Sequence, residues 1–482
     1  MQKLKHVFIS ALIVMSLAVC SWADEYGGGF EALSPEFLKW QAEQEESLPA
    51  TKNALPGSEY PSGYVPFPVD LSHLADNPPI EDDSPIATKK DSTLPTTYDL
   101  RNVGGRSYVT SIKSQLPYGT CWAHASLGAM ESNYLMQGGS ALDLSEMHLA
   151  WYTFRGDDKS AAFKNYHSSS FSYIMDLGGN SFYPVAMFSR LSGPVGESDV
   201  PYGENKQPSK GSPDDYTRKL RLRDAFYLNF GTEPNVNTSS TARDIIKRRI
   251  MENGAVVGNY YSNNPSYYKS PSAGTNYYYN SNSINHAVQI IGWDDNYSRN
   301  NFKSKPSIDG AWLIKNSWGN EWWTGTADVG DDGCFWMSYA QYLTEGTAFV
   351  SEATNTNMKA YYYDALGWCS TYSYSGVSQI YAANVFQSER DESLIEVGFY
   401  TPDNNISYEI SVYAGMSAMP TTSPKPTGAS LESSASGKIA YAGWHTVTLD
   451  TPVTLSEGEY FSVIVRFTNA RSTAVETKVS GW

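Results

Sequence analysis

A cysteine, a glutamine, a histidine and an asparagine stand in contexts that suit nucleophilic catalysis, and Cys121 is the first to consider. It follows the turn-forming residues Pro117 and Gly119 and precedes a stretch, 122–137, in which apolar residues recur at helical spacing. We therefore place Cys121 at the N-terminus of a helix. The backbone N–H groups and the positive end of the helix dipole favour the thiolate there, and the thiolate is the form that attacks a carbonyl carbon.

Gln115 lies six residues before Cys121. At that offset its side-chain NH2 can point at the oxygen of an acyl group that Cys121 attacks, next to the backbone N–H of Cys121 itself. These two groups are the donors that an oxyanion hole requires.

The histidine and the asparagine each accompany an apolar run that predicts a buried strand. His286 precedes the run 287–292, and Asn316 follows the run 311–315. A catalytic imidazole must be held in one orientation and one tautomer. The amide oxygen of Asn316 can accept the ring N–H of His286, and Trp318 can shield that bond from water.

Each of these residues also has an ordinary structural interpretation, because a buried cysteine is usually inert packing and Asn-Ser is a common turn. The order in which the four residues and their motifs occur along the chain is what favours a catalytic role over these structural interpretations. The sequences Gln115-x5-Cys121-Trp-Ala, His286-Ala-Val and Asn316-Ser-Trp-Gly resemble, residue by residue, the motifs of the papain-like cysteine peptidases. The resemblance covers roughly residues 94–350.

The chain departs from the pattern of this family at two positions. Tyr118 stands where most members have a cysteine that forms a structural disulfide, and His124 stands where an aromatic residue is common. The first change removes a covalent bridge and leaves the chemistry untouched. We expect His124 to be an interior or interface residue rather than the catalytic base. No group of residues has metal-ligand spacing, so we predict no metal and no other cofactor.

The resemblance implies an α+β fold with a helical lobe and a β lobe, and it assigns roles to residues. The catalytic set would be Gln115, Cys121, His286 and Asn316. The residues that would contact the substrate are Gly178, Gly179, Ser181, Ile284, Asn285, Ala287 and Trp318. The two glycines would let an extended substrate pair in β fashion. Because Asn285 is neutral, we expect the pocket for the residue two before the cut to prefer an apolar side chain.

Composition and the N-terminus bear on the partners and the location. The chain has 482 residues and a net charge of −16 at pH 7, which argues against nucleic acid or an anionic membrane surface as a partner. Residues 1–23 are typical of a secretory signal, with Lys3 and Lys5 before an apolar core. We therefore expect a secreted or cell-surface associated protein. Lipid attachment at Cys20 is an alternative.

The cysteines leave two alternatives open. Removal of the signal would leave Cys121, Cys334 and Cys369, and an odd number in an exported protein leaves one thiol over. Either Cys334 and Cys369 form a disulfide, which makes Cys121 the free thiol, or both are buried thiols.

Residues 24–93 are rich in Pro, Asp, Glu and Ser and cannot bury a core of their own. Because papain-like peptidases are made as zymogens, this stretch resembles a pro-segment that lies through the cleft and docks its aromatic patch on the enzyme. A flexible linker is the alternative. The peptidase domain is expected at 94–352. Within it we predict a second helix at 239–253 and a long surface loop at 259–283.

Residues 353–482, called the C-terminal domain below, have a different pattern. Short alternating runs separated by turn residues predict an all-β sandwich, with strands at 379–386, 394–400, 408–413, 444–449 and 460–465. The segment resembles the lectin-like domain that follows papain-like domains in some bacterial secreted peptidases, although the chain can end before that domain is complete. A glycan or another cell-surface ligand is its predicted partner, and a purely supporting role is the alternative.

Together these features predict a secreted cysteine endopeptidase, made as a zymogen, that hydrolyses protein or peptide substrates through a Cys-His-Asn triad. One rival is a catalytically silent surface adhesin or glycan-binding protein on a peptidase scaffold. The presence of the whole catalytic set counts against it. The other rival is a transacylase that uses the same triad and differs only in the acyl acceptor.

Overall fold

The computed structural model describes most of the chain after residue 27. The described residues are 28–46, 62–80, 94–155, 171–229, 240–262, 276–279, 284–320, 333–355, 357–363, 365–374, 379–419, 429–468 and 472–475. The predicted signal at 1–23, with Cys20, lies outside them, as does most of the predicted loop at 259–283. Within the described ranges, no helix is both long enough and apolar enough to cross a membrane.

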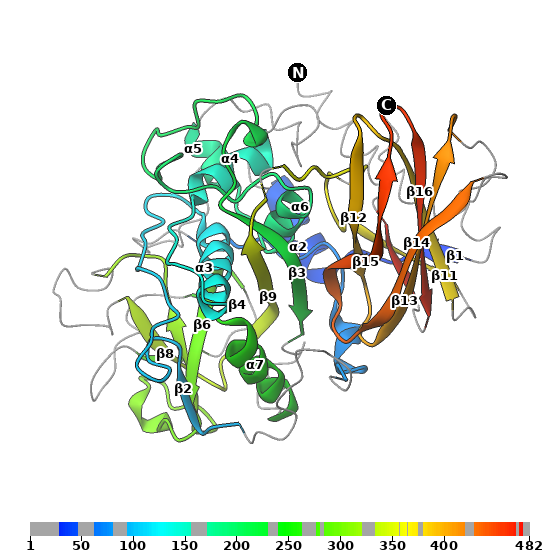
Figure 1. Ribbon diagram of the computed structural model, residues 1–482. Coiled ribbons are helices and arrows are strands. Elements are labelled where there is room, and N and C mark those ends of the chain that lie inside the picture. Colours follow the sequence, from blue (N-terminus) through cyan, green and yellow to red (C-terminus); the bar gives the residue numbers. More distant parts are fainter. Residues whose placement is uncertain are drawn as a thin grey trace.

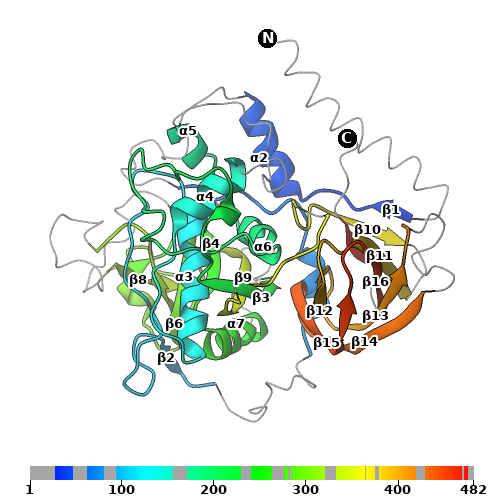
Figure 2. The same cartoon turned by 45° about the horizontal axis from the view of Figure 1, so that its top comes forward.

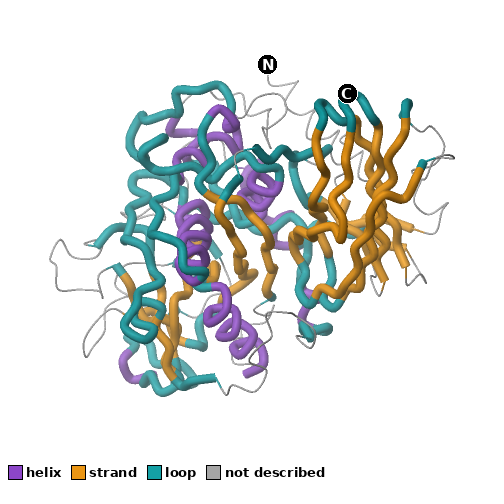
Figure 3. Tube along the Cα trace, viewed as in Figure 1, coloured by secondary structure: helices purple, strands orange, loops and turns teal. Residues whose placement is uncertain are grey.

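The described helices belong to the part of the chain before residue 302, and the later described residues form strands and loops (Figure 3). The helices are α2 (Pro35–Glu46), α3 (Cys121–Met136), α4 (Glu146–Arg155), α5 (Phe171–Met175), α6 (Phe182–Ser189) and α7 (Ser240–Asn253), with 3-10 turns at Ser72–Ala75, Pro213–Asp215 and Arg299–Asn301. The two helices predicted for the peptidase domain are confirmed as α3 and α7. α3 is almost wholly buried because the sheet, α4 and α7 surround it (Figure 1).

One long sheet forms the β lobe and continues into the C-terminal domain. Its strands in the peptidase domain are β2 (Thr97–Asp99), β3 (Leu220–Leu228), β4 (Val256–Tyr260), β5 (Asn276–Tyr277), β6 (His286–Asp294), β7 (Ala311–Lys315), β8 (Cys334–Ser338) and β9 (Leu343–Ala353). They follow the order β3-β9-β4-β6-β7-β8-β5, and β2 pairs with β6. The predicted loop starts later than expected, because Asn259 and Tyr260 are buried in β4 between β6 and β9.

The C-terminal domain is a β sandwich, as predicted. Its strands are β10 (Ser370–Tyr374), β11 (Gln379–Gln387), β12 (Glu392–Thr401), β13 (Ile406–Met416), β14 (Ser430–Ile439), β15 (Gly443–Leu455), β16 (Tyr460–Thr468) and β17 (Ser472–Val475). One antiparallel layer has the order β11-β16-β13-β14, and β12 pairs with β15 in the other. Apolar side chains from both layers, such as Val397, Ile410 and Val463, fill the space between them. The fold class, α+β followed by a β sandwich, is confirmed.

The two domains share the long sheet through β3 and β15. Gly443 pairs with Phe226, and Trp444 pairs with Ala225. Gly443 has a φ of 140°, and a Cβ added there would lie 1.9 Å from the carbonyl oxygen of Ala225. Only glycine therefore allows the two backbones to approach this closely.

The described residues before 81 run along both domains (Figure 2). β1 (Gly28–Phe30) adds to β10 in antiparallel fashion, and α2 follows it. Ser34 begins α2: its Oγ accepts from Phe37 N at 3.1 Å and donates to Phe67 O at 2.8 Å. Residues 62–69 pass over the candidate active site, and 70–80 reach the C-terminal domain.

Candidate active site

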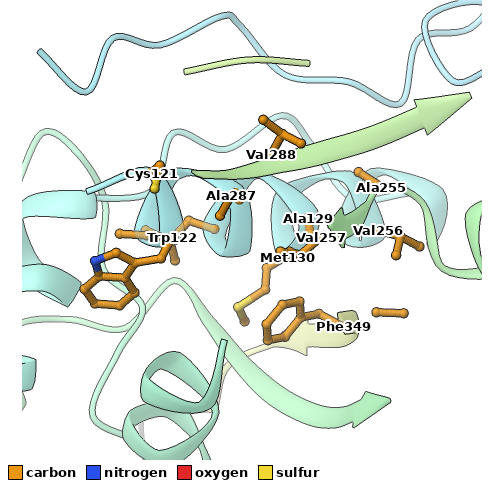
Figure 4. Packing of buried hydrophobic residues seen from close by; sticks show 14 of the residues in the cluster. Cys121, Trp122, Ala129, Met130, Ala255, Val256, Val257, Ala287, Val288 and Phe349 are labelled. Atoms are coloured by element: carbon orange, nitrogen blue, oxygen red, sulfur yellow. The ribbon is translucent and has the colours of Figure 1, made fainter. Parts of the chain in front are cut away.

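Cys121 is the first residue of α3, as the sequence predicted. Two hydrogen bonds fix the preceding loop: Gly119 N donates to Asp176 Oδ1 at 2.9 Å, and Thr120 Oγ1 lies 2.6 Å from Tyr202 Oη. Figure 4 shows Cys121 and Trp122 at the end of α3 beside Ala287 of β6. The start of α3 and the start of β6 therefore meet at this point.

His286 and Asn316 lie at the ends of neighbouring strands, β6 and β7, and their side chains bond directly. His286 Nε2 is 2.9 Å from Asn316 Oδ1, which also accepts from Ser317 N at 2.9 Å. Because this oxygen is an acceptor, Nε2 carries the proton and Nδ1 keeps its lone pair. Among the described residues His286 Nδ1 has no hydrogen-bond partner, although it is buried. The imidazole is thus held in the tautomer that a base at Nδ1 requires.

Aromatic rings enclose this histidine. Trp318 stacks on His286 with ring centroids 4.6 Å apart and an angle of 22° between the planes, and Tyr260 meets it edge-on at 5.7 Å. His286 itself is fully buried. The bond between His286 and Asn316 is therefore kept from water.

Gln115 is oriented by a serine that our sequence reasoning did not select. Ser317 Oγ donates to Gln115 Oε1 at 2.7 Å, and Gln115 N donates to Ser317 O at 2.7 Å. The amide nitrogen of Gln115 then faces the loop before α3, where it donates to Tyr118 O at 3.0 Å. The place of Ser317 inside the Asn-Ser-Trp-Gly motif was the signal that could have identified it.

Residues 63–65 cover the site and pair with one of the two predicted glycines. Gly179 N donates to Gly63 O at 2.8 Å, and Val65 N donates to Gly179 O at 2.9 Å. The neighbouring Gly178 has a φ of 76°, and a Cβ there would lie 2.8 Å from Gly63 O. Both glycines thus allow another backbone to lie against them.

Gly63 also lies against the loop that begins α3. A Cβ on Gly63 would be 1.7 Å from Gly119 O, so the two chains touch backbone to backbone. Backbone groups of Gly63 and Ala287 are also close enough to interact with the Cys121 thiol.

The covered site holds Cys121 and His286 in their neutral forms. Burial raises the pKa of the Cys121 thiol to about 11, and nearby backbone hydrogen bonds offset only part of this effect. Burial likewise lowers the pKa of His286 to about 4, against the opposing bond to Asn316. The expected ease of ionisation at a helix N-terminus is therefore outweighed here by the loss of solvent.

The other residues predicted to contact substrate are Asn285, Ser181, Ile284 and Ala287, and the structure gives each a definite place. Asn285 O accepts from Tyr64 N at 3.1 Å, whereas its side chain turns back to the Ser262 backbone, with bonds of 2.7 and 3.0 Å. Ser181 is buried at the start of α6, Ile284 is half-buried, and Ala287 follows His286 in β6. Asn285 therefore meets residue 64 through its backbone carbonyl oxygen, while its side chain faces Ser262.

Two further predictions have clear outcomes. His124 is an interior residue, since its Nδ1 lies 3.0 Å from Thr120 O and its ring packs edge-on against Tyr202 at 5.0 Å. The disulfide alternative is wrong, because Cys334 and Cys369 are separate thiols. Within the described ranges, no group of three or more His, Cys, Asp or Glu side chains could hold a metal ion.

Two family models match the chain. Residues 94–342 match the model described as papain family cysteine protease, and 360–482 match the one described as lectin-like domain. A cysteine protease of Blomia tropicalis is 25% identical over 241 residues, or 48% of this chain. The match covers 60% of that relative's own length.

Two solved structures resemble the whole arrangement. One contains the cysteine protease and lectin-like domains of Cwp84, a surface layer associated protein of Clostridium difficile, with a TM-score of 0.68 and 23% identity over 95% of this chain and 89% of that one. The other is the clostridial cysteine protease Cwp84 after propeptide cleavage, with a TM-score of 0.62 and 26% identity over 80% of this chain and 89% of that one. The predicted resemblance to papain-like peptidases with a lectin-like domain is confirmed.

Proposed function

The chain belongs to the papain family of cysteine proteases, and on this premise we propose that it is an exported cysteine endopeptidase made as a zymogen. Cys121 is the nucleophile, His286 the base, Asn316 the residue that orients the base, and Gln115 an oxyanion donor. The observation that carries the proposal is the bond of 2.9 Å from His286 Nε2 to Asn316 Oδ1, since it leaves the buried Nδ1 ready to accept a proton.

The reaction follows from this tautomer. His286 Nδ1 takes the thiol proton, and Cys121 Sγ bonds to the carbonyl carbon of the peptide. Gln115 and the backbone N–H of Cys121 stabilise the negative oxygen of the tetrahedral intermediate. His286 then gives its proton to the leaving amine as the C–N bond breaks. Water, deprotonated by the same histidine, cleaves the thioester and releases the acid and the thiol.

Residues 62–69 are the inhibitory part of the pro-segment. They pair with Gly179 where a substrate strand would pair, and they cover Cys121, whose pKa is raised to about 11. A neutral thiol is a poor nucleophile, so the covered form is inactive on both steric and electrostatic grounds. The relative whose structure was determined after propeptide cleavage supports processing as the route to activity.

The proposed location is the outside of the cell. The signal pattern at 1–23 supports export, and the structural relative described as surface layer associated supports retention at the cell surface. A glycan or another cell-surface ligand is proposed for the lectin-like domain. A cavity of about 470 Å³ that includes Tyr361, Trp368 and Phe386 in its lining is the place to test with soluble glycans.

Labelling of the thiol tests the proposed function. The full chain, before and after cleavage near Leu94, is treated with an epoxide that alkylates active-site thiols, mapped by peptide mass, and assayed on casein. We expect modification at Cys121 and casein cleavage in the processed form, with both lost in Cys121→Ala. Cys369→Ala is the matched control and should keep both.

The products separate the rivals. Hydrolysis consumes one water for each bond cleaved, so the masses of the two fragments together equal the substrate plus one water, whereas a transacylase joins fragments into longer chains. A processed chain that neither reacts with the epoxide nor cleaves casein would contradict the peptidase and favour a binding protein on a peptidase scaffold.

A further inference from the structure

Tyr202 borders the loop that precedes α3, although no motif pointed to it. Its ring meets the ring of Tyr118 edge-on, with centroids 6.3 Å apart, and meets the ring of His124 edge-on at 5.0 Å. Tyr118 and His124 are the two positions at which the chain departs from the family pattern. The two departures therefore meet at one tyrosine ring.

The hydroxyl of Tyr202 joins the two ends of this loop. It donates to Gln115 O at 2.6 Å and lies 2.6 Å from Thr120 Oγ1. A phenol has one proton, and a carbonyl oxygen can only accept it, so Thr120 Oγ1 is the donor to the Tyr202 oxygen. Burial raises the pKa of Tyr202 well above its usual value, so the phenol keeps its proton throughout the neutral pH range.

His124 holds the peptide unit between Thr120 and Cys121. His124 Nδ1 lies 3.0 Å from Thr120 O, and because a carbonyl oxygen only accepts, Nδ1 carries the proton and donates it. Burial lowers the pKa of His124 to about 3, so the ring is neutral at the pH of an assay. In a planar trans peptide the C=O and the following N–H point in opposite directions. A fixed Thr120 O therefore fixes the direction of the Cys121 N–H.

These contacts act on the two groups that we propose as oxyanion donors. The first N–H groups of a helix have no partner within the helix, so the Cys121 N–H can face a substrate oxygen. The side-chain amide of Gln115 is held separately, since Ser317 Oγ donates to its Oε1 at 2.7 Å. Tyr202 links the backbone of Gln115 to Thr120, which directly precedes Cys121. One phenol oxygen thus connects the two residues on which the spacing of the donors depends.

The placement of these donors has to come from noncovalent contacts. Residues 115–120 contain no cysteine, so no disulfide holds the loop. Gly119 N donates to Asp176 Oδ1 at 2.9 Å, which fixes the middle of the loop but neither of its ends. A displacement of about 1 Å in a catalytic group can cost about a hundredfold in rate. The hydrogen bonds at the two ends of the loop therefore bear directly on catalysis.

We propose that Tyr202 and His124 are positioning residues for the oxyanion hole: Tyr202 fixes the spacing of its two donors, and His124 fixes the direction of the Cys121 N–H. The inference rests on the proposed peptidase function. Both residues act through the loop, and the oxyanion exists only after Cys121 has attacked the carbonyl. Their loss should therefore lower kcat and leave KM unchanged.

Two variants that keep an aromatic ring test the proposal. The full chain is processed by limited proteolysis between residues 80 and 94 and assayed on a fluorogenic peptide. Tyr202→Phe removes the phenol oxygen, and His124→Phe removes the Nδ1 donor. Loss of a whole oxyanion donor costs about a hundred- to a thousandfold in kcat, so misplacement should cost less. We expect each variant to lower kcat about tenfold and to change KM by less than about twofold.

Three further variants assign the effect to the hydroxyl of Tyr202. Tyr152→Phe is the matched control, because it removes a phenol that donates to Lys210 O at 2.6 Å, and it should keep the unmodified kcat. Thr120→Val removes the donor to Tyr202 and should lower kcat, whereas Thr120→Ser keeps a hydroxyl and should retain activity. In a chain that already carries Gln115→Ala, Tyr202→Phe should add a loss of less than about threefold, because one of the two donors is then absent.

Two thiol reagents separate an effect on the oxyanion hole from damage to the fold. With a peptide aldehyde, Cys121 Sγ bonds to the carbonyl carbon, the C=O π bond opens, and the thiol proton moves to the oxygen, which then lies where the oxyanion would lie. The affinity for this aldehyde should fall about tenfold in Tyr202→Phe and in His124→Phe, in step with kcat. Iodoacetamide loses iodide from a saturated carbon and forms no oxyanion, so it should alkylate Cys121 at the unmodified rate.

The outcomes separate this inference from the function on which it rests. A ring variant that keeps the unmodified kcat and aldehyde affinity would overturn the role of that residue. A fall in iodoacetamide alkylation as large as the fall in kcat would mean that the residue serves the fold and not the oxyanion hole. If the unmodified processed chain neither cleaves the peptide nor reacts with the epoxide at Cys121, the peptidase function itself is contradicted, and the inference falls with it.

Discussion

Residues 62–80, which we propose to be part of a pro-segment, make two kinds of contact, one with the peptidase site and one with the lectin-like domain. Over the site, Gly63 and Val65 bond to Gly179 through backbone atoms alone. Beyond residue 70 the contacts use side chains: His73 Nε2 lies 2.9 Å from Pro402 O, and Asn405 Nδ2 donates to Asn77 Oδ1 at 2.9 Å. Tyr64 adds a side-chain contact, since its hydroxyl donates to Glu345 Oε2, but the pairing with Gly179 itself uses the backbone of the segment.

Inhibition and selective retention of the segment therefore depend on different contacts. Backbone pairing depends little on side chains, so it can block the site without distinguishing this segment from a substrate. The side-chain contacts with the lectin-like domain are specific to this segment, and they increase its local concentration over the site. The first set should decide whether the enzyme is active, and the second how long the cleaved segment remains bound.

Gly63→Ala should have the largest effect. The added Cβ would lie 1.7 Å from the carbonyl oxygen of Gly119, and backbone at the start of α3 cannot move aside as a side chain can. We expect the unprocessed full chain to change from no measurable peptide hydrolysis to a clear rate. Gly211→Ala is the matched control, because a Cβ there meets nothing within 4 Å. If Gly63→Ala hydrolyses no peptide until it is processed, the backbone contact over Cys121 is not what blocks the enzyme.

The next largest effect should appear in the pH dependence of the rate at which the Cys121 thiol is alkylated. Only the thiolate is alkylated, and burial raises the pKa of Cys121 from 9.0 to about 11, so below pH 9 the covered thiol should react about a hundredfold more slowly than an ordinary one. In the unprocessed chain the rate of iodoacetamide alkylation should keep rising towards pH 11. Removal of the segment should produce a reactive thiol at neutral pH.

Mass mapping of Cys121 measures this profile, and the labelling of Cys334 and Cys369 in the same samples serves as an internal reference. Equal rates at neutral pH before and after processing would contradict the idea that the segment suppresses the thiolate.

Asn77→Ala should have the smallest effect. Asn77 Nδ2 donates to Asn404 O at 3.1 Å, and its Oδ1 accepts from Asn405 at 2.9 Å, so the change removes two partly exposed hydrogen bonds. We expect dissociation of the cleaved segment to become about three- to tenfold faster, with the activity of the fully processed enzyme unchanged. Recovery of activity after cleavage measures this rate.

Asp76→Ala changes the exposed neighbour of Asn77 and should recover like the unmodified chain. If Asn77→Ala also recovers at the unmodified rate, the contacts with the lectin-like domain do not retain the segment.

The sequence alone predicted the elements that bear strong local patterns. The start of α3 at Cys121 and the strands that carry His286 and Asn316 follow from apolar periodicity beside recognisable motifs. β14 was not predicted because its serine-rich sequence lacks the apolar alternation of the other strands. The order of the strands in the shared sheet, which joins β3 to β15, also has no local signal.

Long-range contacts account for what was missed at the site. Tyr64 and Glu345 are 281 residues apart, and neither belongs to a motif, so only the fold reveals that they meet. The ionisation of Cys121 was predicted from the helix dipole alone. The opposite shift in its pKa arises from burial, to which Gly63 contributes from a segment remote in sequence.

The junction of β3 and β15 matters for anyone who wishes to engineer this protein. A cut near residue 353 would expose backbone donors and acceptors along Ala225 and Phe226, which are now satisfied by Trp444 and Gly443. Such an open strand edge invites aggregation. The lectin-like domain therefore cannot simply be replaced by another domain. A chimera must keep Gly443 and strand β15, or cover the edge of β3 by other means.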